Sequence, residues 1–193
     1  MSTPSIIDQT IADHEATVKK FREACSETIE KMADATVEAL KNGKKICFFG
    51  NGGSAADSQH LATEFVVRFT RNREALAAIA FTTDTSILTA CANDFGFEEV
   101  FARQVNGLCE SGDIVVGIST SGTSPNIIRG LEAAREKGVT TFAFTGQDGG
   151  ECRKIADETL AVPSTVTARI QECHLIAGHL ICDIGELAFS SES

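Results

Sequence analysis

Residues 46–60 have the sequence ICFFGNGGSAADSQH. The apolar run Ile46 to Phe49 favours a strand that is buried on both faces, and the glycines that follow favour a turn into a helix. Strands of this kind, alternating with helices, are typical of a parallel sheet that helices cover on both sides. The stretch therefore predicts an open α/β fold.

The same pattern of a short apolar run followed by turn residues returns four times. We predict further strands at Ala77 to Phe81, Ile114 to Ile118, Thr141 to Thr145 and Thr159 to Val162, most of them followed by a helix. Two of the later helices have clear limits, at Asn126 to Lys137 and at Thr167 to Leu187. These runs predict one parallel sheet covered by helices.

The N-terminal region predicts a single long helix, an arm at about 6–41 that ends near Gly43. Apolar or small residues recur in steps of four and three, at Ile7, Ile11, His14, Val18, Phe21, Cys25, Thr28, Met32, Ala35 and Ala39. This helix either packs on its own domain alone or also pairs with another subunit. We favour pairing, because the helix is longer than one small core can cover, and we expect a charge at Phe21 to break the assembly.

Length and charge limit the kind of protein. The chain has 193 residues, which suits one domain with an added helical arm. Its 17 Lys and Arg residues against 27 Asp and Glu residues give a net charge of −10, which argues against a protein that grips a nucleic-acid backbone. We therefore expect no nucleic-acid partner, and an anionic ligand would be held by a few placed donors.

Cysteine content and hydropathy indicate the cytoplasm. Seven cysteines, an odd number, form no C-x-x-C pair, and most lie in apolar runs, so we interpret them as reduced core residues. No apolar run approaches the roughly 18 residues of a membrane span, and Met1 to Thr10 lacks the pattern of a signal peptide. We therefore expect a cytoplasmic protein with no membrane partner.

The first candidate ligand loop is Gly50-Asn51-Gly52-Gly53-Ser54, between the first strand and a helix that begins near Ala55. Glycines allow a close approach of the backbone, and the N–H groups at a helix N-terminus attract an anion. The motif is neither a P-loop nor a G-x-G-x-x-G sequence. Taken alone, it is explained equally well by an ordinary glycine turn with Ser54 as the helix N-cap.

The second candidate loop follows the strand at Ile114 to Ile118 and leads through Pro125 into a helix. Ser124 as N-cap and Pro125 as the first helical residue account for two of its positions. The remaining pattern is a set of hydroxyls around Gly122, at Ser119, Thr120, Ser121 and Ser124. Such neutral donors at a helix N-terminus suit a phosphate monoester, so we predict a phosphate site here in preference to a polar turn.

Polar residues on two helices complete the set of motifs. His60 and Glu64 are four residues apart, so their side chains project from one helix face. Gln171 and His179 lie on the last helix among apolar neighbours, where a polar group is costly unless it is satisfied. Each of these residues, taken singly, has an ordinary structural explanation.

The motifs together cover nearly the whole chain. They are GNGGSAADSQH at 50–60 with Glu64, NDFG at 93–96, STSG at 119–122, TGQDGG at 145–150, and RIQE at 169–172 with His174 and His179. In this combination the sequence resembles the phosphoheptose isomerases of the sugar-isomerase (SIS) domain family.

The resemblance implies an architecture and an activity. The fold would be one SIS domain over residues 1–193, a flavodoxin-like five-stranded parallel sheet covered by helices, with the long N-terminal helix. Members form a homotetramer with active sites near subunit contacts, and convert sedoheptulose 7-phosphate into D-glycero-D-manno-heptose 7-phosphate for surface heptose of the lipopolysaccharide type.

The resemblance also implies site residues. Substrate contacts would come from Asn51, Gly52, Gly53, Ser54, Glu64, Asn93, Asp94, Ser119, Thr120, Ser121, Ser124 and Gln171. Zinc, in members that carry it, would be bound by His60, Glu64, Gln171 and His179. Some members have Asp where this chain has Ala168, so an acid/base role at that position has no support here.

Aldose–ketose isomerisation needs a base that takes a proton from one carbon and an acid that protonates the next. We expect Glu64 to be the base and His179 to move protons among the oxygens, while zinc would act as a Lewis acid on the carbonyl oxygen. The two accounts compete for Glu64. Either the metal leaves during catalysis, or only one carboxylate oxygen binds it.

The spacing of Gln171 and His179 raises a question of geometry. Eight residues span about 12 Å along an ideal helix, which is far for two ligands of one ion. Either the helix is distorted near Gly178, or the ligands combine across subunits.

Two other functions remain open from the sequence. The SIS family includes a protein that associates with a bacterial replication initiator and has lost the catalytic acidic and basic positions. A sugar-phosphate sensor would need only the hydroxyl loop. Because Glu64 and His179 are both present, we favour the enzyme.

Overall fold

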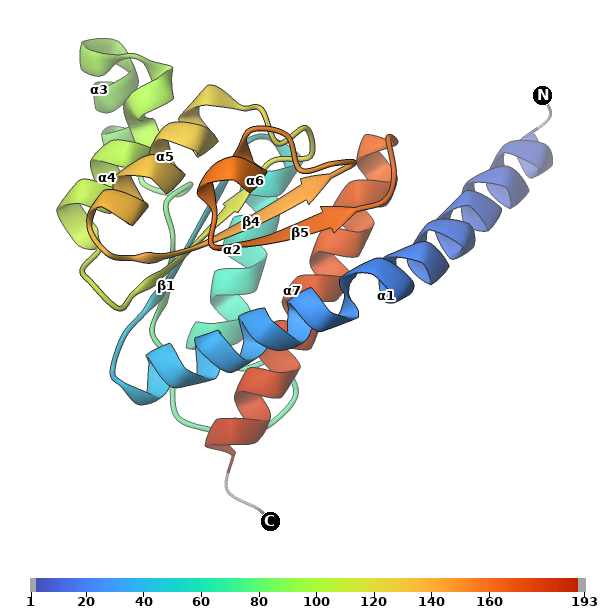
Figure 1. Cartoon of the computed structure of the whole chain (residues 1–193), viewed down its shortest axis with the longest axis horizontal. Coiled ribbons are helices and arrows are strands. Elements are labelled where there is room, and N and C mark those ends of the chain that lie inside the picture. The colour runs from blue at the N-terminus through green and yellow to red at the C-terminus, as the bar shows by residue number, and fades with distance from the viewer. Residues whose placement is uncertain (1–2, 191–193) are drawn as a thin grey trace.

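The computed structural model describes residues 3–190, which form one five-stranded sheet with helices around it (Figure 1). The strands are β1 (Ile46–Gly50), β2 (Ala78–Ala80), β3 (Ile114–Ile118), β4 (Thr140–Gly146) and β5 (Glu158–Val162). All neighbours pair in parallel, in the order β2-β1-β3-β4-β5. The parallel α/β sheet is confirmed, with β3 at its predicted limits and every other strand end within one residue of its predicted position.

Helices cover both faces of the sheet. They are α1 (Thr3–Lys41), α2 (Gly53–Val66), α3 (Thr85–Phe95), α4 (Val100–Leu108), α5 (Pro125–Glu136), α6 (Cys152–Ile155) and α7 (Thr167–Phe189), with a 3-10 turn, η1, at Phe97–Glu99. Helices α1, α2 and α7 pack on one face, and α4, α5 and α6 pack on the other (Figure 1). The ends of α5 and α7 lie within two residues of their predicted positions, whereas the sequence assigned no limits to α3 and α4.

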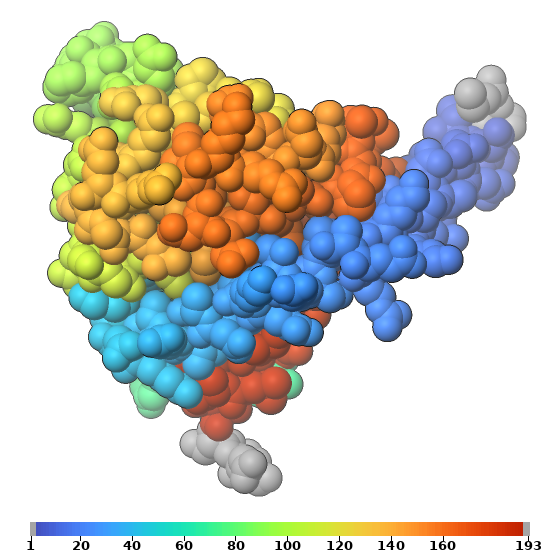
Figure 2. All heavy atoms as spheres, in the orientation of Figure 1, coloured from blue at the N-terminus to red at the C-terminus, as the bar shows by residue number. Residues whose placement is uncertain are grey.

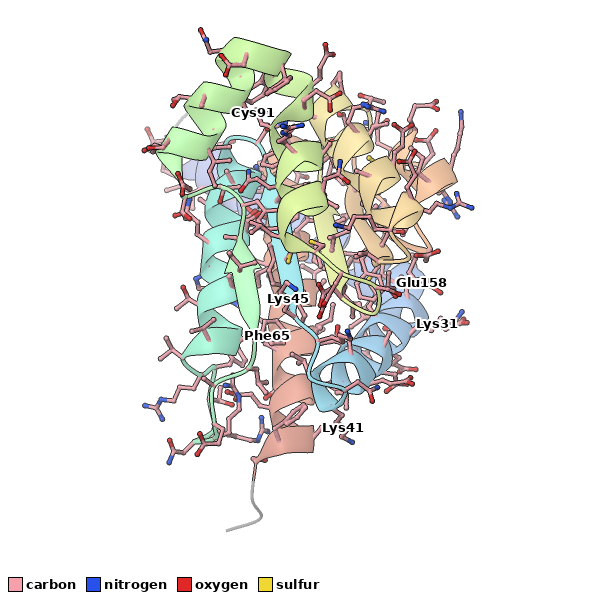
Figure 3. All side chains as sticks on the ribbon, turned by 90° about the vertical axis from the view of Figure 1, so that its left-hand side faces the viewer. Lys31, Lys41, Lys45, Phe65, Cys91 and Glu158 are labelled. Atoms are coloured by element: carbon pink, nitrogen blue, oxygen red, sulfur yellow. The ribbon has the colours of Figure 1, made fainter. Side chains whose placement is uncertain are left out.

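Strand β1 divides its side chains between the two layers, because alternate residues of a strand point to opposite faces. Ile46 and Phe48 belong to the core beneath α1, α2 and α7, where Phe48 stacks on Phe65 with ring centroids 6.0 Å apart. Figure 3 labels Phe65 on α2. Cys47 and Phe49 belong to the core beneath α4 and α5. Burial on both faces is what the apolar run predicts.

All seven cysteines are buried free thiols, so the prediction that they are core residues is confirmed. Burial raises the pKa of the Cys25 and Cys152 thiols to about 11, which keeps both protonated at neutral pH. None of the helices within residues 3–190 combines the length and the apolar character that crossing a bilayer requires.

The buried residues of helix α1 begin at Phe21, near its midpoint. Phe21 and Met32 pack in the core of their own chain, whereas Ile7 and Ile11 are each 53% exposed. In Figure 2 the first turns of this helix extend beyond the body of the molecule. The choice of Phe21 as the interface position is wrong, because its own chain already covers this ring and a charge would disturb that core. Any pairing with a second subunit concerns the exposed first half.

Candidate active site

The glycine loop lies at the carboxyl end of β1 and begins α2. Gly52 is the N-cap residue with a φ of +56°, a conformation that glycine adopts at little cost. Ser54 lies inside α2 and is buried, so its interpretation as the N-cap is wrong: Gly52 turns the chain two residues earlier. Gly52 and Gly53 are both exposed, which leaves their backbone accessible to an anion at this helix N-terminus.

The hydroxyl loop, residues 119–124, brings three serine side chains together after β3. Ser119 Oγ lies 3.0 Å from Ser124 Oγ and 3.4 Å from Ser121 Oγ. Ser124 and Pro125 occupy the N-cap and first position of α5, as predicted, but Ser124 Oγ bonds to Ser119 instead of to the helix backbone. Thr120 is half-buried within the same loop. These hydroxyls therefore face one another and are free to turn toward a ligand.

The two loops meet where the strand order reverses between β1 and β3. Asn51 and Asn126 join them through reciprocal amide hydrogen bonds, each 2.8 Å long. An open hollow of about 410 Å³ adjoins this pair and is lined by Asn51, Phe97, Glu98, Ser124, Pro125 and Asn126. Ligands of open α/β sheets bind at this kind of switch point, so the hollow is the candidate substrate site.

A backbone contact fixes the shape of the hydroxyl loop. Gly122 has a φ of +67°, and a Cβ atom at this residue would lie 2.1 Å from the carbonyl oxygen of Gly149. The carbonyl oxygen of Gly122 accepts the N–H of Cys152 at 2.9 Å. The loop after β3 is thereby held against the loop after β4, and only glycine fits at residue 122.

His60, Glu64 and His179 form a cluster between α2 and α7. The Nε2 atoms of the two histidines lie 2.8 Å apart, and Glu64 Oε1 lies 3.5 Å from His60 Nε2. One donor atom from each residue falls within 4.8 Å of the others. Burial lowers the pKa of His179, and the neighbouring His60 lowers it further. Two imidazoles and one carboxylate are a donor set that first-row metal ions accept.

Gln171 lies near the N-terminal end of α7, away from that cluster, and packs over the glycine loop. A Cβ atom at Gly53 would lie 2.5 Å from Gln171 Nε2, so the amide packs directly on the N-terminus of α2. Helix α7 continues without a break through Gly178, so of the two alternatives a distorted helix is wrong. The glycine serves packing instead, because a Cβ at this residue would lie 2.3 Å from Leu61 Cδ2 of α2.

Asn93 and Asp94 stand apart from the other site residues. They lie near the end of α3, are exposed, and bond to each other at 2.7 Å. Figure 1 shows α3 at the upper left of the molecule. Among residues 3–190, no hydrogen bond or ion pair joins Asn93 or Asp94 to His60, Glu64 or His179.

Sequence analysis does not single out Asn126 or Phe69. The Asn126 side chain is buried and holds Asn51, and the ring of Phe69 stacks on that of His179 with centroids 4.9 Å apart. Both contacts join residues distant in the chain, so a single sequence carries no direct signal for either.

Comparison with known proteins identifies the family. Residues 11–146 match the family model of the SIS domain. The chain belongs to the SIS domain family. Two curated relatives of this SIS protein bear the name phosphoheptose isomerase. One, from Paramagnetospirillum magneticum, is 52% identical over 95% of either chain, and the other, from Aquifex aeolicus, is 54% identical over 86% of this chain and 87% of the relative.

Solved structures agree with that membership. A phosphoheptose isomerase from Neisseria gonorrhoeae is 40% identical to this SIS protein, with a TM-score of 0.92 over 96% of this chain and 100% of the other. One from Francisella tularensis is 34% identical, with a TM-score of 0.94 over 97% and 100% of the two chains. The flavodoxin-like arrangement with a long N-terminal helix is therefore that of known SIS structures.

Proposed function

We propose that this SIS protein is a phosphoheptose isomerase that converts sedoheptulose 7-phosphate into D-glycero-D-manno-heptose 7-phosphate. The product would supply surface heptose of the lipopolysaccharide type. Relatives of that name at 52% and 54% identity support the reaction. The observation that carries it is the presence, in one chain, of a hydroxyl loop beside a hollow and of a carboxylate next to two imidazoles.

The phosphate end of the substrate would bind at the hydroxyl loop. Ser119, Ser121 and Ser124 donate to its oxygens, and the N-terminus of α5 adds the favourable end of its dipole. Further contacts are assigned to Asn51, Gly52, Gly53, Ser54, Thr120 and Gln171 on the same side of the sheet, and to Asn93 and Asp94 near the end of α3.

The proton transfers are assigned to Glu64 and His179. Glu64 takes a proton from C1 of the ketose and returns it to C2 of the enediolate, which converts the C2 carbonyl into an alcohol. His179 moves the remaining proton from the C1 oxygen to the C2 oxygen, so the new aldehyde forms at C1. The Glu64 side chain is only 16% exposed, which shields the transferred proton from exchange with bulk water.

The metal ion we propose is zinc, held by His60, Glu64 and His179 of one chain, with Gln171 from a second copy as the fourth ligand. The donor set of the first three residues fits this ion. When bound, zinc would supply Lewis-acid polarisation of the substrate carbonyl. A carboxylate has two oxygens, so Glu64 can serve both roles if one oxygen binds the metal and the other takes the proton.

We further propose that residues 1–193 act as a single SIS domain in a cytoplasmic homotetramer. The exposed isoleucines at the start of α1 support an assembly, and the unbroken run of α7 between Gln171 and His179 supports a site shared between chains. The sequence-based alternative, a non-catalytic SIS protein that binds a replication initiator or senses a sugar phosphate, receives no support from the relatives.

The function is tested by mixing the purified chain with sedoheptulose 7-phosphate and following the aldose by NMR. We expect turnover, and far less with unphosphorylated sedoheptulose. Saturable binding of the phosphate ester without formation of aldose would identify a sugar-phosphate sensor. If the protein neither binds nor converts the ester, it is not an isomerase or a sensor of this sugar, and a role in binding another protein remains.

A further inference from the structure

A buried carboxylate near the end of α7 organises the segment that follows α2. Glu186 Oε1 accepts the backbone N–H of Phe69 at 2.6 Å, and Oε2 accepts those of Thr70 and Arg71, each at 2.8 Å. Its side chain is 1% exposed. Burial alone would raise the pKa of Glu186, but these N–H groups and Arg73 outweigh it and hold the pKa below its usual value. The group is therefore a fixed negative charge.

The matching cation is Arg73, whose side chain is 0% exposed. Its Nη2 lies 3.3 Å from Glu186 Oε1 and also donates to the carbonyl oxygen of Glu64 at 2.7 Å, while Nη1 donates to that of Phe65 at 2.8 Å. These carbonyls belong to the last turn of α2, so Arg73 caps this helix. Removing either Arg73 or Glu186 would leave the charge of the other buried and unpaired. Loss of either residue should therefore disturb the segment at residues 69–73 that follows α2.

Both candidate catalytic residues depend on this ion pair for their surroundings. Phe69, whose N–H is bound by Glu186, stacks on the ring of His179 at an interplanar angle of 27°. Glu64 has its own backbone carbonyl bound by Arg73. His179 and Glu186 are seven residues apart on α7, so they project from the same face toward the same segment.

We propose that Arg73 and Glu186 are positioning residues for the isomerase site: together they hold Phe69 so that its ring fixes the plane of the His179 imidazole, and they fix the end of α2 that carries Glu64. The inference rests on the roles proposed above for Glu64 and His179. The competing explanation is an ion pair that stabilises the fold and has no effect on the site.

The chain contains a matched control for that competing explanation. Asp113 is another buried carboxylate: it accepts the backbone N–H of Lys45 at 3.0 Å and of Glu110 at 2.8 Å, and pairs with Lys45 Nζ at 2.6 Å. Its side chain is 0% exposed. The pair lies at the amino ends of β1 and β3, where Figure 3 labels Lys45, at the opposite end of these strands from the ligand loops. Asp113→Asn removes the same charge from a similar environment.

The experiment compares Glu186→Gln, Asp113→Asn, Phe69→Leu and Phe69→Tyr in the full chain. We expect both ion-pair variants to lower the free energy of unfolding in urea, but only Glu186→Gln to lower kcat, by about tenfold or more, with KM changed less than about twofold. Phe69→Leu should reproduce the loss of kcat with little loss of stability, and Phe69→Tyr, which keeps the ring, should retain wild-type kcat.

A second readout is independent of turnover. The chain has four histidines, so the imidazole carbon–proton NMR spectrum is simple enough to assign. The His179 signal, which lies in the ring current of Phe69, should shift in Glu186→Gln and Phe69→Leu and remain in place in Asp113→Asn. An unmoved His179 signal in Glu186→Gln, or equal kcat losses in the two ion-pair variants, would overturn the proposal.

The same variants separate this proposal from the proposed function. If His179→Gln keeps wild-type turnover, the catalytic role of His179 is wrong. The ring displacement in Glu186→Gln would then still appear in the NMR spectrum, without a loss of kcat. If Glu186→Gln does not fold, Arg73→Lys takes its place in both measurements, since it keeps the charge but cannot make all the guanidinium bonds to Glu186 and to the end of α2.

Discussion

The Nε2 atoms of His60 and His179 face each other at 2.8 Å. Two imidazole nitrogens can approach this closely only when something lies between their lone pairs, either a proton carried by one ring or a metal ion bound by both. The two occupants exclude each other. The pair therefore either shares a hydrogen bond, in which one ring carries its proton on Nε2, or binds a metal ion through both Nε2 atoms, in which case that proton must leave Nε2, for example by moving to Nδ1 of the same ring.

Replacing His60 should weaken metal binding. His60→Gln removes one imidazole from the cluster, so we expect zinc content after dialysis to fall by about tenfold or more. Metal analysis of the dialysed protein measures this, with His14→Gln as the control because His14 bonds to Glu172, about two helical turns along α7 from His179. Equal zinc contents in the two variants would rule out His60 as a ligand, and unchanged turnover in chelator would remove the metal from the reaction.

Replacing Glu64 should slow the reaction without preventing binding. Glu64→Gln keeps the shape of the side chain and removes the base, so turnover should fall by a factor on the order of 10² or more while KM changes little. Steady-state kinetics provide the measurement. Glu30→Gln, an exposed position on α1, is the control for the loss of one charge. A Glu64→Gln protein with wild-type turnover would exclude Glu64 as the base.

Replacing a serine of the hydroxyl loop should affect the phosphate ester selectively. Ser121→Ala removes one donor, so KM for sedoheptulose 7-phosphate should rise several-fold, and the change should be much smaller with the unphosphorylated ketose. Ser111→Ala serves as the control, since this exposed hydroxyl donates to the carbonyl of Gly138 away from the site. Equal changes with both substrates would mean that the loop has a structural role only.

The exposed half of α1 should hold the assembly together. Ile11→Glu puts a charge at a 53% exposed isoleucine, which should dissociate the oligomer in light scattering at little cost to the fold of each chain. Gln9→Glu adds the same charge on this arm without removing an apolar side chain, and should leave the oligomer intact. A monomeric wild-type protein would contradict the assembly. A dissociated but fully active Ile11→Glu protein would contradict the shared site.

Acid should destabilise the fold through His174. This side chain is fully buried, with Nε2 2.9 Å from the carbonyl oxygen of Thr145, and burial lowers its pKa to about 4. Unfolded histidine titrates near pH 6.5, so below that pH the unfolded chain takes up a proton that the folded chain refuses. The contribution of His174 is complete above pH 6.5 and should decline by on the order of 3 kcal/mol as the pH falls toward 4.

Urea unfolding at about pH 7.5 and about pH 5 measures this loss in the wild type and in His174→Gln, whose side chain does not titrate in the range. The variant is expected to be less stable at the higher pH and to lose less on acidification. Identical pH dependence in the two proteins would assign the acid sensitivity to other groups.

The sequence is informative wherever a residue's neighbours in the chain determine its place. The strand at Ile114 to Ile118 is apolar on both faces and bounded by polar residues, so its limits are correct, and His60 and Glu64 share a face because helix geometry requires it. The prediction of Ser54 as the N-cap is wrong because Gly52 caps α2 through its backbone conformation and not through a side chain. Gly and Ser are both common at helix N-caps, so the sequence does not decide between Gly52 and Ser54.

Contacts across the fold are less accessible. Phe69 meets His179, and Asn51 meets Asn126, only because packing brings distant segments together. The exposure of Ile7 could not be predicted from the sequence, because apolar residues at helical spacing form the same pattern whether their own chain or another chain covers them. The sequence gives no limits for α3 and α4 because the two helices are separated only by Gly96 and the 3-10 turn η1, without a longer loop between them.

The backbone contact between Gly122 and Gly149 helps to fix the shape of the hydroxyl loop, whereas its serine side chains supply the donors for a ligand. Main-chain hydrogen bonds from Cys152 to Gly122 and from Gly146 to Thr120 also hold the loop, so phosphate binding has little conformational entropy left to remove from it. The free energy of the phosphate contacts can then serve to orient the distant sugar carbons. Because these bonds use no serine side chain, the path of the backbone and the set of hydroxyl donors can change separately, and a scaffold of this kind can accept new sugar phosphates through changes in side chains.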